Sequence, residues 1–323
     1  MVVSHDPAGH QTPSASLSLA PVMAESQETR SGAASTAALA FAFGAVALWA
    51  TNALVGKTLL ADHPVSAVQF LQFCGAALVF ALIRLAGGAR AMPPRPAGLA
   101  AALAPFAVGF LGLVGTMVLQ YLAFASMPVI EANLVAYTWP LMVAAALIVL
   151  GRPRRPLLLG LTAALGFVGV ALVITGGHDQ SWLRGSLAGY AAAFGSALCM
   201  AFYSIAVGRL AVSPDRLLLP SALIGVALTL AWCLHDGASI PTGLDLLLGL
   251  YLGAGPMGLG YYFWSRALKL DQGGRLAVVA YLTPIASTLL LALSGESLSM
   301  TAIAGAVLVI GSCIAVGIER SET

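Results

Sequence analysis

Apolar runs of about 20 residues, the length that crosses the hydrocarbon core of a bilayer, recur along the sequence between short segments that carry proline and arginine. A segment that spans lipid must satisfy its own backbone hydrogen bonds, as a helix does. The pattern therefore predicts an all-α membrane protein with ten transmembrane helices. These helices are expected at residues 36–56, 65–85, 98–121, 128–150, 157–175, 186–207, 217–234, 243–265, 276–293 and 300–318.

Residues 1–33 lack this pattern and are rich in serine, alanine and proline. A segment with so little apolar surface cannot offset the entropy lost on ordering, so we expect a disordered cytoplasmic tail. A secretory signal within residues 1–50 is the alternative. It fits less well, because the basic start of such a signal is missing and the apolar run is long enough to span.

The composition assigns the chain to a lipid environment. Only 9% of its residues are Asp, Glu, Lys or Arg and 59% are hydrophobic, whereas about a quarter of a soluble domain is charged. If the N-terminus is cytoplasmic, the loops on the outer side receive only Lys57 and Arg184. Cytoplasmic loops are enriched in Lys and Arg, so both termini are expected in the cytoplasm.

The chain also repeats itself at an offset of 144 residues. Residues 121–147 align with residues 265–291, so that "AYTWP" (136–140) overlies "AYLTP" (280–284). A looser match relates "FGAVALWATNALVGK" to "FGSALCMAFYSIAVGR", residues 43–57 and 194–209, with one insertion.

These matches predict two repeats of five helices each, residues 34–177 and 178–323. Because five is odd, the second repeat must enter the membrane inverted. Inverted repeats are typical of secondary transporters, whose substrate site lies near the midplane where the repeats meet.

Pro140 and Pro284 occupy equivalent positions in the two repeats. Each removes one helical hydrogen bond and frees the carbonyl four residues earlier, at Ala136 and Ala280. A pair related by the repeat indicates helix kinks that take part in gating. A simple packing kink, which membrane helices tolerate, is the alternative.

The motifs "LWATN", "AYTWP", "AYLTP" and "GYYFWSRALK" resemble those of the drug/metabolite transporter superfamily and its EamA-type repeat, over residues 36–318. Within it, the ten-helix layout is similar to that of the YddG-type bacterial amino acid exporters. The resemblance implies amino acid export across a bacterial inner membrane. The superfamily also carries drugs, nucleotide sugars and other metabolites, so the substrate stays open between amino acids and cationic aromatic drugs.

Polar side chains are costly inside a membrane and usually face the bundle interior or a water-filled cavity. Amides suit the carboxylate and ammonium of a zwitterion, and aromatic faces attract cations and flat apolar groups. The residues expected to line a substrate cavity are Trp49, Asn52, Gln69, Gln72, Gln120, Asn133, Tyr137, Ser196, Tyr203, Tyr251, Tyr262, Trp264 and Tyr281.

Two alternatives stay open for these residues. Gln, Asn and Ser side chains, such as those of Gln69, Gln72 and Ser196, commonly form hydrogen bonds that hold membrane helices together. Trp139 and Trp264 can instead belong to the aromatic belt at the membrane surface.

No Asp, Glu, Lys or Arg falls in the central third of a predicted helix. A proton-coupled transporter usually needs an intramembrane carboxylate or histidine. We therefore expect uncoupled transport by alternating access. The alternative is proton coupling through Glu131, at the outer end of the fourth predicted helix.

Other protein classes lack their motifs in this sequence. No G-x-x-x-x-G-K-[ST] phosphate loop supports an ATP-driven pump, and the histidines are too scattered for an enzyme site. We expect no catalytic residues, metal, cofactor or nucleic-acid partner. An internal repeat that builds one site favours a functional monomer over an oligomeric channel. A purely structural or receptor role remains an alternative.

Overall fold

The computed structural model describes residues 36–87, 98–151, 155–175, 186–270, 275–293 and 299–321. Helices make up nearly all of this part of the chain, and it contains no strand. The N-terminal tail expected at residues 1–33 lies outside the described residues.

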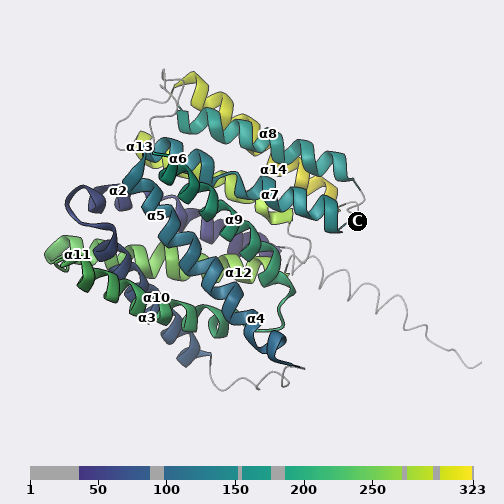
Figure 1. Ribbon diagram of the computed structural model, residues 1–323. Helices are drawn as coiled ribbons and strands as arrows, with labels where there is room; N and C mark the ends of the chain where they lie inside the picture. Colours follow the sequence, from purple (N-terminus) through teal and green to yellow (C-terminus); the bar gives the residue numbers. More distant parts are fainter. Residues whose placement is uncertain are drawn as a thin grey trace, which may run out of the picture.

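The first half of the chain forms five spans, three of which are interrupted (Figure 1). In chain order they are a helix over residues 36–49 continued by α2 (Asn52–Asp62); α3 (Val65–Ala86); α4 (Leu99–Gly109), a π-helical stretch (Phe110–Gly115) and α5 (Thr116–Ser126); α6 (Val129–Ala136), α7 (Trp139–Ala146) and a second π-helical stretch (Leu147–Gly151); and α8 (Pro156–Thr175).

The second half forms the remaining spans. They are α9 (Leu187–Arg209); α10 (Pro214–Asp236); α11 (Gly243–Leu252), a π-helical stretch (Gly253–Leu259) and α12 (Gly260–Leu270); a 3₁₀ helix (Arg275–Tyr281) continued by α13 (Leu282–Leu293); and α14 (Met300–Ser321).

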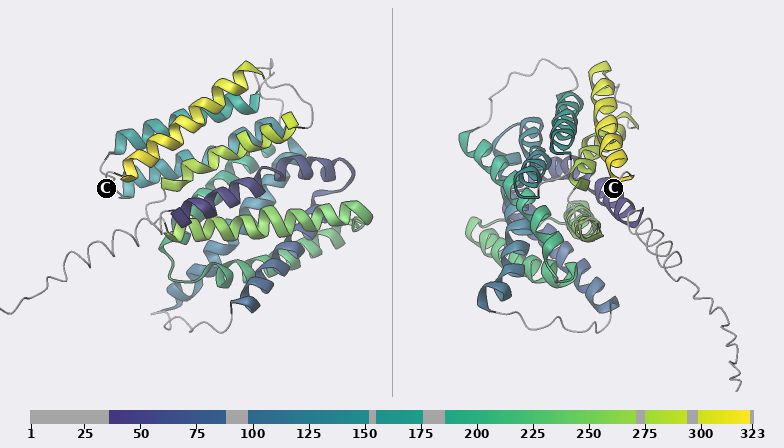
Figure 2. Two further views of the ribbon diagram at one scale, coloured as in Figure 1. Left: turned by 180° about the vertical axis from the view of Figure 1, so that it is seen from behind. Right: turned by 90° about the vertical axis from the view of Figure 1, so that its right-hand side faces the viewer.

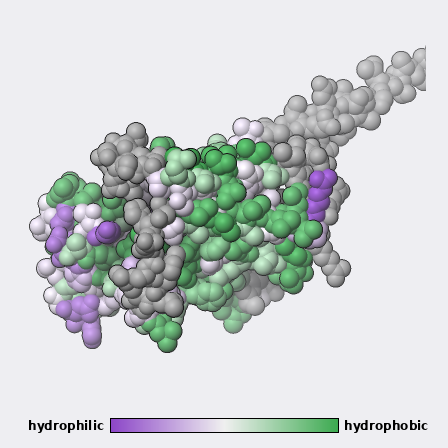
Figure 3. Space-filling view, turned by 90° about the horizontal axis from the view of Figure 1, so that it is seen from above, coloured by the Kyte–Doolittle hydropathy of each residue, from purple (hydrophilic) through white to green (hydrophobic). Residues whose placement is uncertain are grey.

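The exposed surface matches a lipid environment. Eight helices in the described part are long and apolar enough to cross a membrane, and two shorter apolar helices follow, Leu276–Leu290 and Met300–Ala315. Figure 3 shows a hydrophobic middle, with hydrophilic residues gathered toward the two ends. Leu78, Leu161 and Leu223 are more than half exposed. The chain is a multi-pass, all-α membrane protein, which confirms the predicted fold class.

The two halves are interrupted at equivalent places. An offset of 144 residues brings the π-helical stretch of the third span onto residues 254–259, within the stretch of the eighth span. At the same offset, the starts of α7 and α13 agree to within one residue. The shared interruptions support the two-repeat architecture.

Each of the paired prolines lies in the first turn of a helix. Pro140 is the second residue of α7 and Pro284 the third residue of α13. Pro140 follows a two-residue interruption after α6, where a backbone N–H would have no helical partner, so its absence costs little. Pro284 follows the change from the 3₁₀ helix to α13, which leaves no gap. Each proline therefore marks an irregularity in its span, and we call both irregularities helix breaks.

The outer helices frame a central group of spans. α8 packs along α14 and α3 packs along α10, and these two pairs lie at opposite edges of the bundle (Figures 1 and 2). Glycines permit the first contact: a Cβ added at Gly169 would lie 2.7 Å from the carbonyl oxygen of Gly305. The other spans lie between the two pairs and surround the site described next.

Candidate substrate cavity

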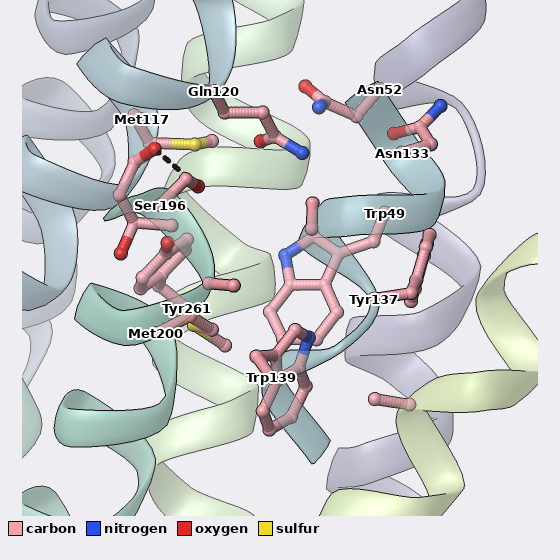
Figure 4. A pocket seen from close by; sticks show the side chains of 14 residues that line it. Trp49, Asn52, Met117, Gln120, Asn133, Tyr137, Trp139, Ser196, Met200 and Tyr261 are labelled. Carbon is pink, nitrogen blue, oxygen red and sulfur yellow. Dashed lines mark hydrogen bonds between the residues drawn. The ribbon is translucent and has the colours of Figure 1, made fainter. Parts of the chain in front are cut away.

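A cavity opens between the first, third, fourth, sixth, eighth and ninth spans (Figure 4). The space between the protein atoms here is about 630 Å³, a volume that includes open solvent outside the mouth. Both repeats contribute to its lining, which consists of Trp49, Asn52, Thr116, Met117, Gln120, Asn133, Ala136, Tyr137, Trp139, Ser196, Ala197, Met200, Tyr261 and Ala280.

Three amide side chains gather at one end of the cavity, here called the amide end. Asn52 begins α2, Gln120 lies in α5 and Asn133 lies in α6. Figure 4 shows the amides of Asn52 and Gln120 pointing toward each other. Amides both donate and accept hydrogen bonds, so this end can bind a polar group of either kind.

Aromatic rings close the opposite end, here called the aromatic floor: Trp49, Trp139, Tyr203, Tyr261 and Trp264. The Trp264 ring lies 5.4 Å from that of Trp49 and 5.6 Å from that of Trp139, measured between centroids. Tyr261 lies 6.0 Å from Trp49 and 5.6 Å from Tyr203. Each such tilted or edge-to-face pair adds about 0.5–1.5 kcal/mol to the burial of the rings. The floor is therefore stiff as well as apolar.

Hydrogen bonds fix the two central indoles of the floor. The Trp49 indole N–H donates to the carbonyl oxygen of Pro256, at 3.0 Å, within the π-helical stretch of the eighth span. The Trp264 indole N–H donates to Ser204 Oγ at 3.1 Å. Because both N–H groups are satisfied within the protein, the Trp49 ring offers its apolar faces to the cavity.

The two helix breaks reach the cavity. Ala136 ends α6 and Ala280 lies near the end of the 3₁₀ helix, and both line the cavity. These are the residues whose carbonyls the two prolines free. The paired sequence motif thus places a helix break from each repeat at the same cavity.

Among the residues that the structure describes, no charged side chain lines the cavity. Glu131 lies elsewhere in the first turn of α6, where it is 3% exposed and accepts a hydrogen bond from the Tyr190 hydroxyl of α9. The cavity itself is therefore neutral.

The structure brings together part of the predicted set. The predicted residues that line the cavity are Trp49, Asn52, Gln120, Asn133, Tyr137 and Ser196. Tyr203 and Trp264 lie just behind it, as the buried part of the aromatic floor. Trp139 and Trp264 are 6% and 0% exposed, so neither lies in an aromatic belt at the membrane surface.

The other predicted residues lie away from the lining. Gln69 and Gln72 are fully buried behind Asn52. Tyr251 is 40% exposed, and its hydroxyl is 2.9 Å from Thr51 Oγ1. Tyr262 packs beside Phe263, and Tyr281 is buried with residues of α8 and α14.

Sequence reasoning missed several lining residues. They are Met117, Ala136, Trp139, Ala197, Met200, Tyr261 and Ala280. The repeat held a usable signal for two of them: an offset of 144 residues relates Met117 to Tyr261, and an offset of 151 relates Trp49 to Met200.

Known proteins resemble this chain in sequence and in fold. The EamA-like transporter family matches residues 36–175 and 187–318. The aromatic amino acid exporter YddG of Ancylobacter novellus is 31% identical over 288 residues, which cover 86% of this chain and 96% of that exporter. A solved crystal structure superimposes with a TM-score of 0.73 at 27% identity, covering 88% of this chain and 98% of that one. The resemblance to the drug/metabolite transporter superfamily is confirmed, and the chain belongs to the EamA-like transporter family.

Proposed function

We propose that the chain is a secondary transporter that exports amino acids, including aromatic and apolar ones, from a bacterial cytoplasm by alternating access through the cavity. One observation carries the proposal: a neutral cavity combines amides at one end with tryptophan and tyrosine rings at the other. A zwitterion with an apolar side chain matches both ends. The relative in Ancylobacter novellus, an aromatic amino acid exporter, supports the substrate class and the direction.

Packing on one side of the cavity supports an outward-facing arrangement. In the predicted topology, the aromatic floor lies toward the cytoplasm and the amide end toward the outside. Tyr203 and Trp264 of the floor, together with Leu276 and Ala277, are at most 3% exposed, so side chains separate the cavity from the cytoplasmic end. In our proposal the breaks before Pro140 and Pro284 act in gating, bending when this packing opens.

We further propose that one chain in the inner membrane suffices, with residues 34–177 and 178–323 as its repeats, because both contribute to a single cavity. The neutral lining supports transport without proton coupling. Coupling through Glu131 is the second candidate, because this carboxylate is buried and shares a hydrogen bond with Tyr190 between the fourth and sixth spans.

Counterflow of labelled phenylalanine into proteoliposomes loaded with unlabelled phenylalanine tests these alternatives. We expect accumulation that is equal with and without a pH gradient. Transport that needs the gradient and is lost in Glu131→Gln would replace the uncoupled mechanism with a coupled one. Movement of a quaternary ammonium dye without any amino acid would make the protein a drug exporter.

A further inference from the structure

A chain of buried hydrogen bonds runs from the amide end of the cavity into the packing between α3 and α5. The Tyr121 hydroxyl donates to Asn52 Oδ1 at 3.2 Å and accepts from Gln72 Nε2 at 2.6 Å. Gln72 Oε1 in turn accepts from Gln69 Nε2. We call these four residues the amide relay. Only Asn52 reaches the cavity, since the other three have no exposed surface.

The relay has a direction, because a tyrosine hydroxyl has a single proton to donate. Since Gln72 donates to Tyr121, the hydroxyl proton goes to Asn52, whose amide must present its oxygen. At the far end, Gln69 Oε1 has no partner among the described residues. The reverse order would leave the Gln69 amide N–H groups buried instead, and orphaned N–H groups are rarer than under-satisfied carbonyls.

This direction determines what Asn52 offers to a ligand. An amide has one oxygen and one NH₂ group. Because the oxygen is held by Tyr121, the NH₂ group of Asn52 remains for the cavity. Asn52 therefore acts there as a donor, although an asparagine elsewhere can present either group.

A glycine makes room for the relay. Gly56 lies one helical turn after Asn52 in α2, and a Cβ added at Gly56 would lie 2.6 Å from the Tyr121 hydroxyl oxygen and 3.2 Å from its Cζ atom. Any larger residue would push the hydroxyl away from its present position. The hydroxyl reaches Asn52 because position 56 has no side chain.

We propose that Asn52 donates to the carboxylate of the transported amino acid, and that Gln69, Gln72 and Tyr121 are positioning residues that hold Asn52 as a donor. The inference rests on the proposed function and adds the group that recognises the carboxylate of the substrate. Gln120, which faces Asn52 across the amide end, is placed to complete the contact. The side chain of the substrate then points toward the aromatic floor.

Asn52→Asp gives the sharpest test. The substitution keeps the shape and the oxygen that accepts from Tyr121, but it replaces the donor by a second oxygen. In phenylalanine counterflow we expect KM to rise about tenfold or more, as loss of a hydrogen bond to a charged group predicts, with kcat little changed. Inhibition by phenylethylamine, which has the ring and the ammonium but no carboxylate, should be kept or strengthened.

Gly56→Ala tests the positioning role without removing a polar group. It should displace the Tyr121 hydroxyl and raise KM for phenylalanine several-fold, again without weakening phenylethylamine. Gly160→Ala in α8 is the matched control, because its Cβ would meet only Ile148 Cδ1, at 3.4 Å, and it should transport like the wild type.

The outcomes separate the two proposals. If the wild-type protein moves no amino acid, the proposed function fails, and the inference fails with it. If the wild type moves phenylalanine while Asn52→Asp leaves KM unchanged, the inference alone is overturned. Equal weakening of phenylalanine and phenylethylamine would also overturn it, because a merely structural role predicts that result.

Discussion

The two repeats build one cavity from unlike residues. An offset of 144 residues relates the third and fourth spans to the eighth and ninth, and an offset of 151 relates the first span to the sixth. Equivalent residues line the cavity from both repeats in three pairs: Trp49 with Met200, Met117 with Tyr261, and Ala136 with Ala280.

At six other equivalent pairs only the first repeat lines the cavity. The cavity residues are Asn52, Thr116, Gln120, Asn133, Tyr137 and Trp139, and their counterparts, all buried in the packing, are Tyr203, Gly260, Trp264, Ala277, Tyr281 and Thr283. All three amides of the cavity therefore come from the first repeat, while the second supplies much of the support for the floor.

One hydrogen bond shows how the difference arises. Asn52 accepts from Tyr121 between the first and third spans, and the equivalent pair, Tyr203 and Ser265, lies 2.5 Å apart between the sixth and eighth spans. The large and the small residue have exchanged places. In the first repeat the small residue, Asn52, faces the cavity, whereas in the second the large residue, Tyr203, forms part of the buried floor. The same contact thus orients a substrate-binding group in the first repeat, whereas in the second it only holds two helices together.

The largest effect is expected where an equivalent pair differs most. Trp264→Ala removes a fully buried ring from the floor and should lower the free energy of unfolding by about 3–5 kcal/mol. Gln120→Ala, its counterpart, should change stability little and raise KM for phenylalanine. Thermal unfolding in detergent and counterflow measure the two effects. Similar losses of stability in both variants would contradict the asymmetry.

The next largest effect is a loss of stability when a glycine at a helix contact is replaced by alanine, and we expect it in both repeats. Gly109 and Gly253 are equivalent, and the nearest backbone atom to an added Cβ would be the Leu217 carbonyl oxygen at 2.8 Å in one case and, closer still, the Gln72 carbonyl oxygen in the other. Both contacts involve backbone that cannot move aside. Gly109→Ala and Gly253→Ala should each cost about 1–3 kcal/mol of stability. A thermal shift in only one of them would show that the backbone is less symmetric than the spans suggest.

The two buried tyrosines, Tyr121 and Tyr203, should differ in their effect on transport. Tyr121→Phe and Tyr203→Phe each remove a buried hydroxyl with a hydrogen-bond partner, so each should lose about 1 kcal/mol of stability. Only Tyr121→Phe should raise KM for phenylalanine, because only Tyr121 orients a cavity residue. An equal rise in KM in both variants would show that the rise comes from a general loosening of the helix packing and not from the orientation of Asn52.

The smallest effect is expected at the outer rim, where the first span meets the eighth. His63 Nε2 lies 2.9 Å from Asp245 Oδ2, and these side chains are 18% and 41% exposed. Solvent-accessible pairs of this kind contribute at most about 1 kcal/mol. His63→Ala should therefore shift thermal unfolding slightly and leave KM for phenylalanine unchanged. A change in KM would show that the substrate site extends to this rim.

The sequence predicted the framework well because hydropathy and proline act locally. The ten apolar runs mark the spans, and Pro140 and Pro284 mark the breaks that bring Ala136 and Ala280 to the cavity. The choice of cavity residues depends on neighbouring helices instead. A polar stripe indicates the inward face of α3, but not that Tyr121 packs against it and keeps Gln69 and Gln72 from the cavity.

Apolar lining residues were harder to predict for a different reason. Met117, Met200 and Tyr261 do not differ in residue type from those that pack helices together, so composition cannot single them out. Tyr281 shows the converse, since its hydroxyl suggested a cavity residue while its ring packs against Gly166 of α8. The exchange of large and small residues between the repeats becomes visible only when the helices are placed side by side.

A structure of the protein with bound 4-bromophenylalanine would show which end of the cavity holds the ring of the substrate, because anomalous scattering locates the bromine independently of the rest of the ligand. We predict one bromine peak at the aromatic floor, beside Trp49 and Trp139, with the ligand carboxylate within hydrogen-bond distance of Asn52 Nδ2. A bromine peak at the amide end, or a ligand bound only outside the cavity, would contradict the assignment of the polar end to the first repeat.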